Sequence, residues 1–181
     1  MTYWLDNRFK IIFALAVESG LRISDILKLK VKDVEKNPMR IYETKSKRDR
    51  VIWLSDELHK DLLYMCNWAR DNDYVFNSHA KHGVPVHRST IHRHIKKALK
   101  WVDFDASAHS ARKLYAHNVY EDTGSVEKVQ KAMNHQKYET TLTYLDIPQQ
   151  DGDKTQKSAT QSPKFSIFSI FKKIFGKRKK S

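Results

Sequence analysis

Six side chains of the types used in phosphoryl transfer follow one another along this chain in an order that suits one composite site. An arginine follows a glycine between two apolar stretches, and a lysine opens a polar turn. A histidine and a second arginine are three residues apart, and a second histidine precedes a tyrosine by nine residues. Taken singly, each has an ordinary explanation, such as an ion pair, a solvated lysine or a packed ring. In chain order they are Arg22, Lys45, His109, Arg112, His135 and Tyr144.

Together, these residue types supply what is needed to cleave a phosphodiester without a metal ion. Arginine forks bind the non-bridging oxygens and stabilise the charge of the transition state. A tyrosine hydroxyl, whose ordinary pKa is about 10, attacks phosphorus once a neighbour accepts its proton. A lysine protonates the departing sugar oxygen. The joint pattern therefore predicts phosphodiester cleavage with tyrosine as the nucleophile, and it predicts neither a metal nor a cofactor.

The elements that carry these residues are predicted to be mostly helical. Residues 7–19 are apolar on most sides, which is typical of a central core helix, and Ser19-Gly20 ends it. Ser24-Asp25 is a start signal for a second, short helix. Strands are expected at 40–44 and 50–54 around the polar turn 45–49, and further helices at 55–70, 88–102, 108–121, 125–133 and 138–145. The expected fold class is mainly α with a small antiparallel β-hairpin (α+β).

Length and composition exclude several classes of protein. The chain has 181 residues, and its one cysteine, Cys66, cannot form an internal disulfide, which excludes a disulfide-stapled secreted scaffold. No uncharged apolar run is long enough to span a membrane, and the run at 11–17 fits a buried helix better than a signal peptide. Lys and Arg number 34 against 21 Asp and Glu, a net charge of +13. This predicts a polyanionic partner, either nucleic acid or an anionic membrane surface.

Four segments that hold the six residues resemble the catalytic boxes of the tyrosine recombinases, the phage integrase family. Residues 18–27 (ESGLRISDIL) resemble the first arginine box, and residues 44–54 (TKSKRDRVIWL) resemble the β-hairpin that carries the lysine. Residues 109–113 (HSARK) resemble the His-x-x-Arg box, and residues 133–144 (MNHQKYETTLTY) resemble the final histidine and nucleophile box. The resemblance covers about residues 7–146, with all six positions filled in order.

This resemblance implies a site-specific DNA recombinase of the integrase or invertase type. Tyr144 would attack a DNA phosphate, form a 3′-phosphotyrosyl link and release a 5′-hydroxyl. Lys45 would be the general acid for the leaving 5′-oxygen. The other roles it implies are phosphate binding by Arg22, Arg112 and His135, and orientation or deprotonation of the tyrosine by His109.

Three departures from the family pattern are visible. Asn134 stands where glycine is usual, and asparagine adopts left-handed backbone more readily than most residues. Ala111 replaces the usual leucine, which changes packing only. The chain also starts almost at the catalytic region, so the family's N-terminal core-binding domain is expected to be absent, as in the short fimbrial invertases. The expected organisation is a catalytic domain at 1–146, a flexible linker at 147–163 and a basic amphipathic tail at 164–181.

The helix expected at 88–102 carries many bases among apolar residues. A solvated amphipathic face is the ordinary explanation, but the cleavage chemistry favours contact with DNA phosphates. The candidate DNA-binding residues are Arg88, Arg93, Lys96, Lys97 and Lys100. His92 and His94 lie on different sides of this helix without a cysteine pair, so zinc is not predicted.

The tail beyond residue 163 combines an apolar helical face with a basic cluster. Residues 151–181 hold nine of the 34 bases but only two of the 21 acids. Three interpretations stay open: docking on a neighbouring copy of the chain, as the resemblance implies, binding to anionic lipid or non-specific DNA, or a disordered basic end.

Three functions are weighed on these grounds. The favoured one is a recombinase that acts on a mobile element or invertible segment in the bacterial cytoplasm, associated with the nucleoid. Its expected partners are double-stranded DNA, further copies of itself (a tetramer, as the resemblance implies) and accessory DNA-binding proteins, but not a membrane. The alternative is a non-catalytic or truncated DNA-binding relic of the same fold. A third is a topoisomerase-like nicking enzyme that never exchanges strands.

Overall fold

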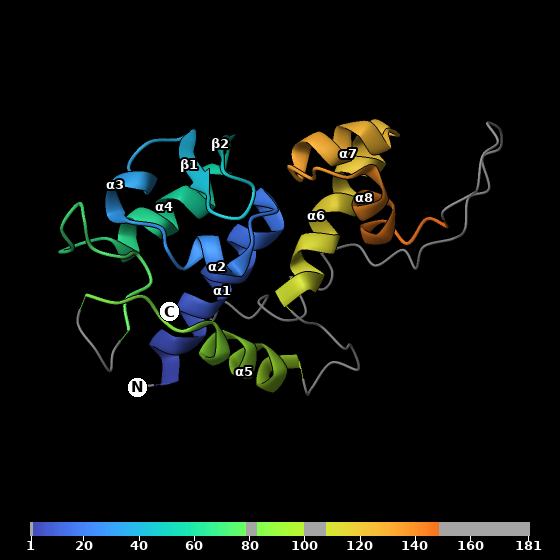
Figure 1. Ribbon diagram of the computed structural model, residues 1–181. Helices are drawn as coiled ribbons and strands as arrows, with labels where there is room; N and C mark the ends of the chain where they lie inside the picture. Colours follow the sequence, from blue (N-terminus) through green and yellow to red (C-terminus); the bar gives the residue numbers. More distant parts are fainter. Residues whose placement is uncertain (1, 79–82, 100–107, 149–181) are drawn as a thin grey trace.

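The computed structural model describes residues 2–78, 83–99 and 108–148 (Figure 1). Helices α1–α4 and a hairpin form one group, and α6, α7 and α8 gather beside it (Figure 1). The expected linker and tail beyond residue 148 lie outside the described residues. The elements are α1 (Thr2–Ser19), α2 (Ile23–Ile26), α3 (Val31–Val34), β1 (Met39–Glu43), β2 (Arg48–Ile52), α4 (Asp56–Met65), α5 (Arg88–Leu99), α6 (Ala108–Thr123), α7 (Val126–Ala132) and α8 (Tyr138–Tyr144). The predicted fold class is confirmed.

Helix α1 is central in the larger group because it is apolar on most sides. All residues from Ile11 to Val17 are buried, and Leu15 and Ala16 have no exposed surface. The helix packs against α2, α4, α5 and α6, so a narrow apolar stripe would not cover its contacts. It begins at Thr2, earlier than predicted, and ends at Ser19 as predicted.

Strands β1 and β2 form the predicted antiparallel hairpin. The register pairs Met39 with Ile52 and Glu43 with Arg48. Both strands begin and end one or two residues before the predicted bounds, because the turn lies within residues 44–47 and Lys47 takes a φ of +52° there. Every second residue of β1 is buried, and the last of these is Glu43. A carboxylate at a position that normally holds an apolar side chain indicates a polar site behind the hairpin.

Helix α6 connects the two groups of helices. Its Ala111 belongs to the large apolar cluster around α1, whereas its Ala116 packs with Val129, Met133 and Leu145 in a smaller cluster. Helix α7 packs against both α6 and α8. The end of α8, where the tyrosine lies, is thereby positioned by α6 and α7 rather than by the large core.

Two local features near the first group were not predicted. A short helix, α3, forms where none was predicted, and its start is stabilised by Asp33, whose carboxylate accepts from the N–H of Lys30 at 2.9 Å. Helix α4 begins at its predicted Ser55 cap but ends at Met65, five residues early, because Trp68 takes a left-handed φ of +77°. Nothing in the side chains around Trp68 signals this turn, since no glycine is present there.

Within the described part of the chain, no helix is both long enough and apolar enough to cross a membrane.

Candidate active site

The corner between α1 and α2 places the first arginine. Gly20 takes a φ of +63°, and its N–H still donates to the carbonyl of Ala16 at 3.0 Å. A Cβ atom at Gly20 would lie 2.3 Å from the ring of Tyr115 on α6, so no other residue fits here without displacing that ring. The corner is thus held tightly against α6, and Arg22 follows at the N-cap of α2.

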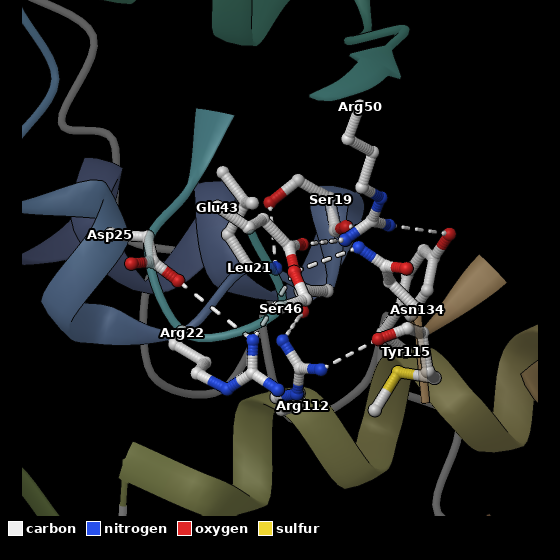
Figure 2. Close-up of polar contacts among 12 residues, drawn as sticks. Ser19, Leu21, Arg22, Asp25, Glu43, Ser46, Arg50, Arg112, Tyr115 and Asn134 are labelled. Atoms are coloured by element: carbon white, nitrogen blue, oxygen red, sulfur yellow. Dashed lines mark hydrogen bonds and ion pairs between the residues drawn. The ribbon is translucent and has the colours of Figure 1, made fainter. Parts of the chain in front are cut away.

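Two carboxylates hold the guanidinium of Arg22. Its Nη1 lies 3.2 Å from Oε2 of Glu43 and 4.0 Å from Oδ2 of Asp25 (Figure 2). Burial raises the pKa of the Asp25 carboxyl, and the charge of Arg22 opposes that rise. The short helix predicted from Ser24-Asp25 is present, but it begins one residue earlier, at Ile23, and Asp25 lies in its first turn, near Arg22.

Arg112 is the buried arginine of the site. Its side chain donates from Nη1 to the carbonyl of Gly20 and from Nη2 to the carbonyl of Met133 at 2.8 Å, which ties the α1–α2 corner to the segment after α7. Burial and the neighbouring charge of Arg22 lower the pKa of Arg112 to about 10, so the group stays charged at neutral pH. Among the described residues its buried Nε has no hydrogen-bond partner.

His135 follows a residue in left-handed backbone and is partly buried. Asn134 takes a φ of +54°, which confirms that it tolerates the conformation expected of the family's glycine. Nδ1 of His135 lies 3.1 Å from the hydroxyl oxygen of buried Thr141. Burial, together with the charges of Arg112 and Arg22, lowers the pKa of His135 to about 4. The imidazole is therefore neutral at physiological pH.

We expect the free energy of unfolding to fall as the pH drops from about 6.5 to about 4. In the unfolded chain His135 takes up its proton as the pH falls through about 6.5. In the folded protein the ring stays neutral until the pH falls to about 4. Between these values the unfolded state binds more protons and is favoured. One pKa unit corresponds to about 1.4 kcal/mol, so we expect a loss of about 1–2 kcal/mol for this partly exposed ring.

The measurement is urea unfolding at several pH values between 4 and 7 for the wild type and for His135→Asn. The variant should lack that part of the pH dependence. Identical slopes in both proteins would show that another group causes it.

Tyr144 is the last residue of α8 and is partly buried. Its ring centroid lies 5.0 Å from that of His135, at an interplanar angle of 54°. An electrostatic interaction also links the side chain of Tyr144 with the guanidinium of Arg112. The structure therefore brings together Arg22, Arg112, His135 and Tyr144, which come from four segments of the chain.

Two of the predicted site residues are not joined to this cluster by a described side-chain contact. Lys45 lies in the turn between β1 and β2 with an exposed side chain, directly before buried Ser46. His109 lies on α6, three residues before Arg112, and its side chain is outside the described part of the structure. Their roles stay predictions.

The carboxylate at the centre of the site, Glu43, was not predicted from the sequence. Glu43 has no exposed surface, and its two oxygens accept from Arg22, Arg50, Ser46 and Asn134 (Figure 2). Burial opposes its charge, but the hydrogen bonds from Ser46 and Arg50 and the nearby guanidinium groups outweigh burial and hold the pKa of Glu43 below its ordinary value. An acid at an inward strand position, with an arginine on the paired strand, is the signal that could have found it.

The predicted DNA-binding residues are only partly described. Helix α5 buries Ile91 against the large core, and its Arg88 and Arg93 are exposed. Lys96 and Lys97 lie on the same helix with side chains outside the described part, and Lys100 lies outside the described residues. Among the described residues, no three His, Cys, Asp or Glu side chains form a group that could hold a metal.

Comparison with solved structures places this fold among the catalytic regions of tyrosine recombinases. The crystal structure of XerA recombinase superposes with a TM-score of 0.63 at 22% identity, over 79% of this chain and 58% of that one. The structure of XerH recombinase bound to difH before cleavage gives 0.64 at 20% identity, over 80% of this chain and 44% of that one. These likenesses confirm the predicted fold.

The chain belongs to the phage integrase family, whose profile matches residues 3–150. It is 28% identical over 144 residues to a probable integrase/recombinase, YoeC, of Bacillus subtilis, covering 78% of this chain and 79% of that relative. It is also 28% identical over 150 residues to a tyrosine recombinase of Thermosipho africanus, covering 81% of this chain and 52% of the relative. The predicted family and enzyme class, tyrosine-type DNA breakage and rejoining, are therefore confirmed.

Proposed function

We propose that this chain cleaves one strand of duplex DNA by attack of Tyr144 and then passes that strand to a second 5′-hydroxyl. The observation that supports this most is the meeting of two arginines, a neutral histidine and a tyrosine from four segments. Burial and the charge of Arg22 lower the pKa of Arg112, and an anion bound beside the two guanidinium groups would offset their repulsion. The rings of His135 and Tyr144 lie side by side, with 5.0 Å between their centroids.

The two arginines are suited to bind the scissile phosphate. Arg112 is fixed by the carbonyls of Gly20 and Met133, and its Nε is the donor without a partner among the described residues. Arg22 is fixed by the carboxylate of Glu43 on one side and is partly exposed on the other. Because both groups are held before substrate arrives, they stabilise the extra charge of a pentacoordinate transition state without reorganising.

Cleavage exchanges one phosphoester bond for another. The Tyr144 hydroxyl oxygen bonds to phosphorus as the bond from phosphorus to the 5′-oxygen breaks, and the phenol proton passes to His109. Lys45 gives a proton to the departing 5′-oxygen. Attack of a 5′-hydroxyl from another duplex reverses these steps and frees Tyr144, so the bond energy is retained and no net oxidation or hydrolysis occurs.

His135 donates to the phosphate in its neutral form. If the Thr141 hydroxyl donates to Nδ1, the proton of the imidazole lies on Nε2, which is then free to bond a non-bridging oxygen. Binding of the anionic phosphate offsets the charges of Arg22 and Arg112 that lower the pKa of this ring. The bound phosphate therefore both accepts the hydrogen bond from Nε2 of His135 and compensates the positive charges around this ring.

The partners follow from the same chemistry. Duplex DNA is the substrate, with phosphate contacts from the exposed Arg88 and Arg93 of α5. Strand exchange needs two duplexes and several active sites, so we propose a homo-oligomer on DNA, with accessory DNA-binding proteins as further partners and the bacterial nucleoid as the place of action. The solved XerH relative was captured on its own difH substrate, which supports a DNA substrate here.

The experiment that tests this is covalent trapping. The protein is mixed with a plasmid that carries its gene and flanking DNA, the reaction is stopped with SDS, and protein that stays on DNA is isolated. The attached peptide is identified by mass spectrometry, and the cleavage site is mapped by sequencing. We expect attachment through Tyr144 to a 3′-phosphate, with free 5′-hydroxyl ends.

The other outcomes separate the alternatives. DNA binding without any attachment, in low salt and with DNA in excess, would contradict the proposal and favour a non-catalytic DNA-binding protein. Attachment with religation but no transfer to a second duplex would favour a nicking enzyme.

A further inference from the structure

The two halves of the site belong to different apolar clusters. The hairpin that carries Lys45 packs on the large cluster through Ile41 and Ile52, whereas Met133, next to the His135 segment, packs in the small cluster. Packing within either cluster leaves the spacing between the lysine turn and the histidine segment to other contacts. Helix α6, which packs in both clusters, and the polar groups that cross between the halves together set that spacing.

One side-chain amide crosses directly from one half to the other. Nδ2 of Asn134 donates to Oγ of Ser46 at 2.9 Å and to Oε2 of Glu43 at 3.2 Å (Figure 2). Asn134 immediately precedes His135, and Ser46 immediately follows Lys45. Both amide hydrogens are thus used to hold the lysine turn beside the histidine segment.

The contacts of Asn134 close a ring with the buried carboxylate. Ser46 accepts from Asn134 and donates its own proton to Oε2 of Glu43 at 2.8 Å, so its hydroxyl is satisfied in both directions. Both Ser46 and Glu43 are buried, which makes each of these bonds costly to lose. Bonds within the hairpin hold the turn to Glu43, and the bond from Asn134 links that turn to the histidine segment.

The carboxylate is in turn fixed from its other side. Oε1 of Glu43 accepts from Nη1 of Arg50 at 3.0 Å, and Nη2 of Arg50 donates to the carbonyl of Ser19 and to the Tyr115 hydroxyl at 3.3 Å. Glu43 is thus a rigid anchor, tied to the α1–α2 corner and to α6. The hydrogen bond from Asn134 to Glu43 therefore fixes the position of the segment that follows Asn134.

We propose that Asn134 is a positioning residue that sets the lysine turn against the histidine segment through Ser46 and Glu43. It determines how far the ammonium group of Lys45 stands from the departing 5′-oxygen, while it touches neither DNA nor the reacting atoms. This inference rests on the proposed function, in which Lys45 protonates that oxygen. A misplacement of about 1 Å in such a group can cost about 100-fold in rate.

The test compares two leaving atoms at the mapped cleavage site. In one duplex the scissile phosphate carries the ordinary 5′-oxygen, and in the other a 5′-bridging sulfur. A thiol has an ordinary pKa of about 8.5, so the sulfur departs as a thiolate and needs no general acid. Any defect confined to proton donation is therefore relieved on the sulfur duplex, whereas a defect in phosphate binding or in the nucleophile is not.

The main variant is Asn134→Gly, because glycine keeps the left-handed φ of +54° and removes only the amide. Ser46→Ala removes the acceptor of that amide from the other side and serves as a second, independent variant. Gln136→Gly, an exposed neighbour in the same segment, is the matched control. Lys45→Ala shows how far the sulfur duplex restores cleavage when the general acid itself is lost.

We expect Asn134→Gly to slow covalent complex formation about 30-fold on the oxygen duplex and less than five-fold on the sulfur duplex. Its dissociation constant for DNA should stay near that of the wild type, its melting temperature should fall by a few degrees because two buried hydrogen bonds are lost, and Gln136→Gly should behave as the wild type on both duplexes. Ser46→Ala should show the same selective defect, smaller in size.

Two results would overturn the inference. Equal slowing on both duplexes would mean that Asn134 acts on the phosphate site or on stability as a whole, and no slowing on either would mean that the link is dispensable. If Lys45→Ala is not rescued by sulfur while the wild type cleaves normally, the acid role of Lys45 fails, and with it the positioning role. If the wild type cleaves neither duplex, the proposed function itself fails.

Discussion

Tyr144→Phe is expected to bind DNA as tightly as the wild type and to form no covalent complex. The hydroxyl is the only atom that the substitution removes, and the ring can keep its place beside His135, 5.0 Å between centroids. Loss of a nucleophile leaves only catalysis by the binding groups, so we expect cleavage to fall by at least about 1000-fold. The measurement pairs SDS trapping with a binding titration at the same salt concentration.

Tyr138→Phe is the matched control, because Tyr138 begins the same helix and is 39% exposed. It should form the covalent complex at the wild-type rate. Attachment by Tyr144→Phe at more than a few per cent of wild type would mean that another side chain is the nucleophile. Weakened DNA binding by Tyr144→Phe would instead mean that the hydroxyl contributes to affinity.

The second large effect is expected for Arg112→Lys. Arg112 donates from two different nitrogens to the carbonyls of Gly20 and Met133, and a lysine has one nitrogen at the end of a flexible stem. The charge is retained, but one buried carbonyl loses its donor and the phosphate loses a planar fork. We expect the cleavage rate to fall about 100- to 1000-fold and the free energy of unfolding to fall by about 1–3 kcal/mol.

Single-turnover cleavage and urea unfolding measure the two effects separately. Arg40→Lys, at an exposed position of β1, is the control. Its cleavage rate should stay within two-fold of the wild type, and its free energy of unfolding should stay within about 0.5 kcal/mol. If Arg112→Lys cleaves within five-fold of the wild type, a positive charge alone is enough and the fork geometry is not required.

The pair of substitutions addresses two different parts of the mechanism. Tyr144 supplies the attacking oxygen, and its loss leaves the phosphate site intact. Arg112 both binds the phosphate and joins the α1–α2 corner to the segment that precedes His135. If cleavage slows in both variants but only Arg112→Lys loses stability, then Tyr144 acts in catalysis alone and Arg112 acts in both catalysis and folding.

Local pattern was sufficient for most of the elements. The apolar run of α1, the Ser55 cap of α4 and the Ser125 cap of α7 each act over a few residues, so their sequence neighbours determine them. The hairpin was also predicted, but its strands begin one or two residues earlier, because the pairing of Glu43 with Arg48 depends on what each strand buries. The end of α4 was missed because the turn at Trp68 carries no glycine.

The sequence by itself determined which residue types are available for phosphodiester cleavage, in which order, and on which helices and turns they lie. Only the tertiary structure decided that Arg22, Arg112, His135 and Tyr144 meet, and that a buried Glu43 lies among them. The contacts of Asn134 with Glu43 and Ser46 span 91 and 88 residues. Such contacts have no periodicity or spacing that a sequence can display, because they depend on how two separately packed clusters face each other across α6.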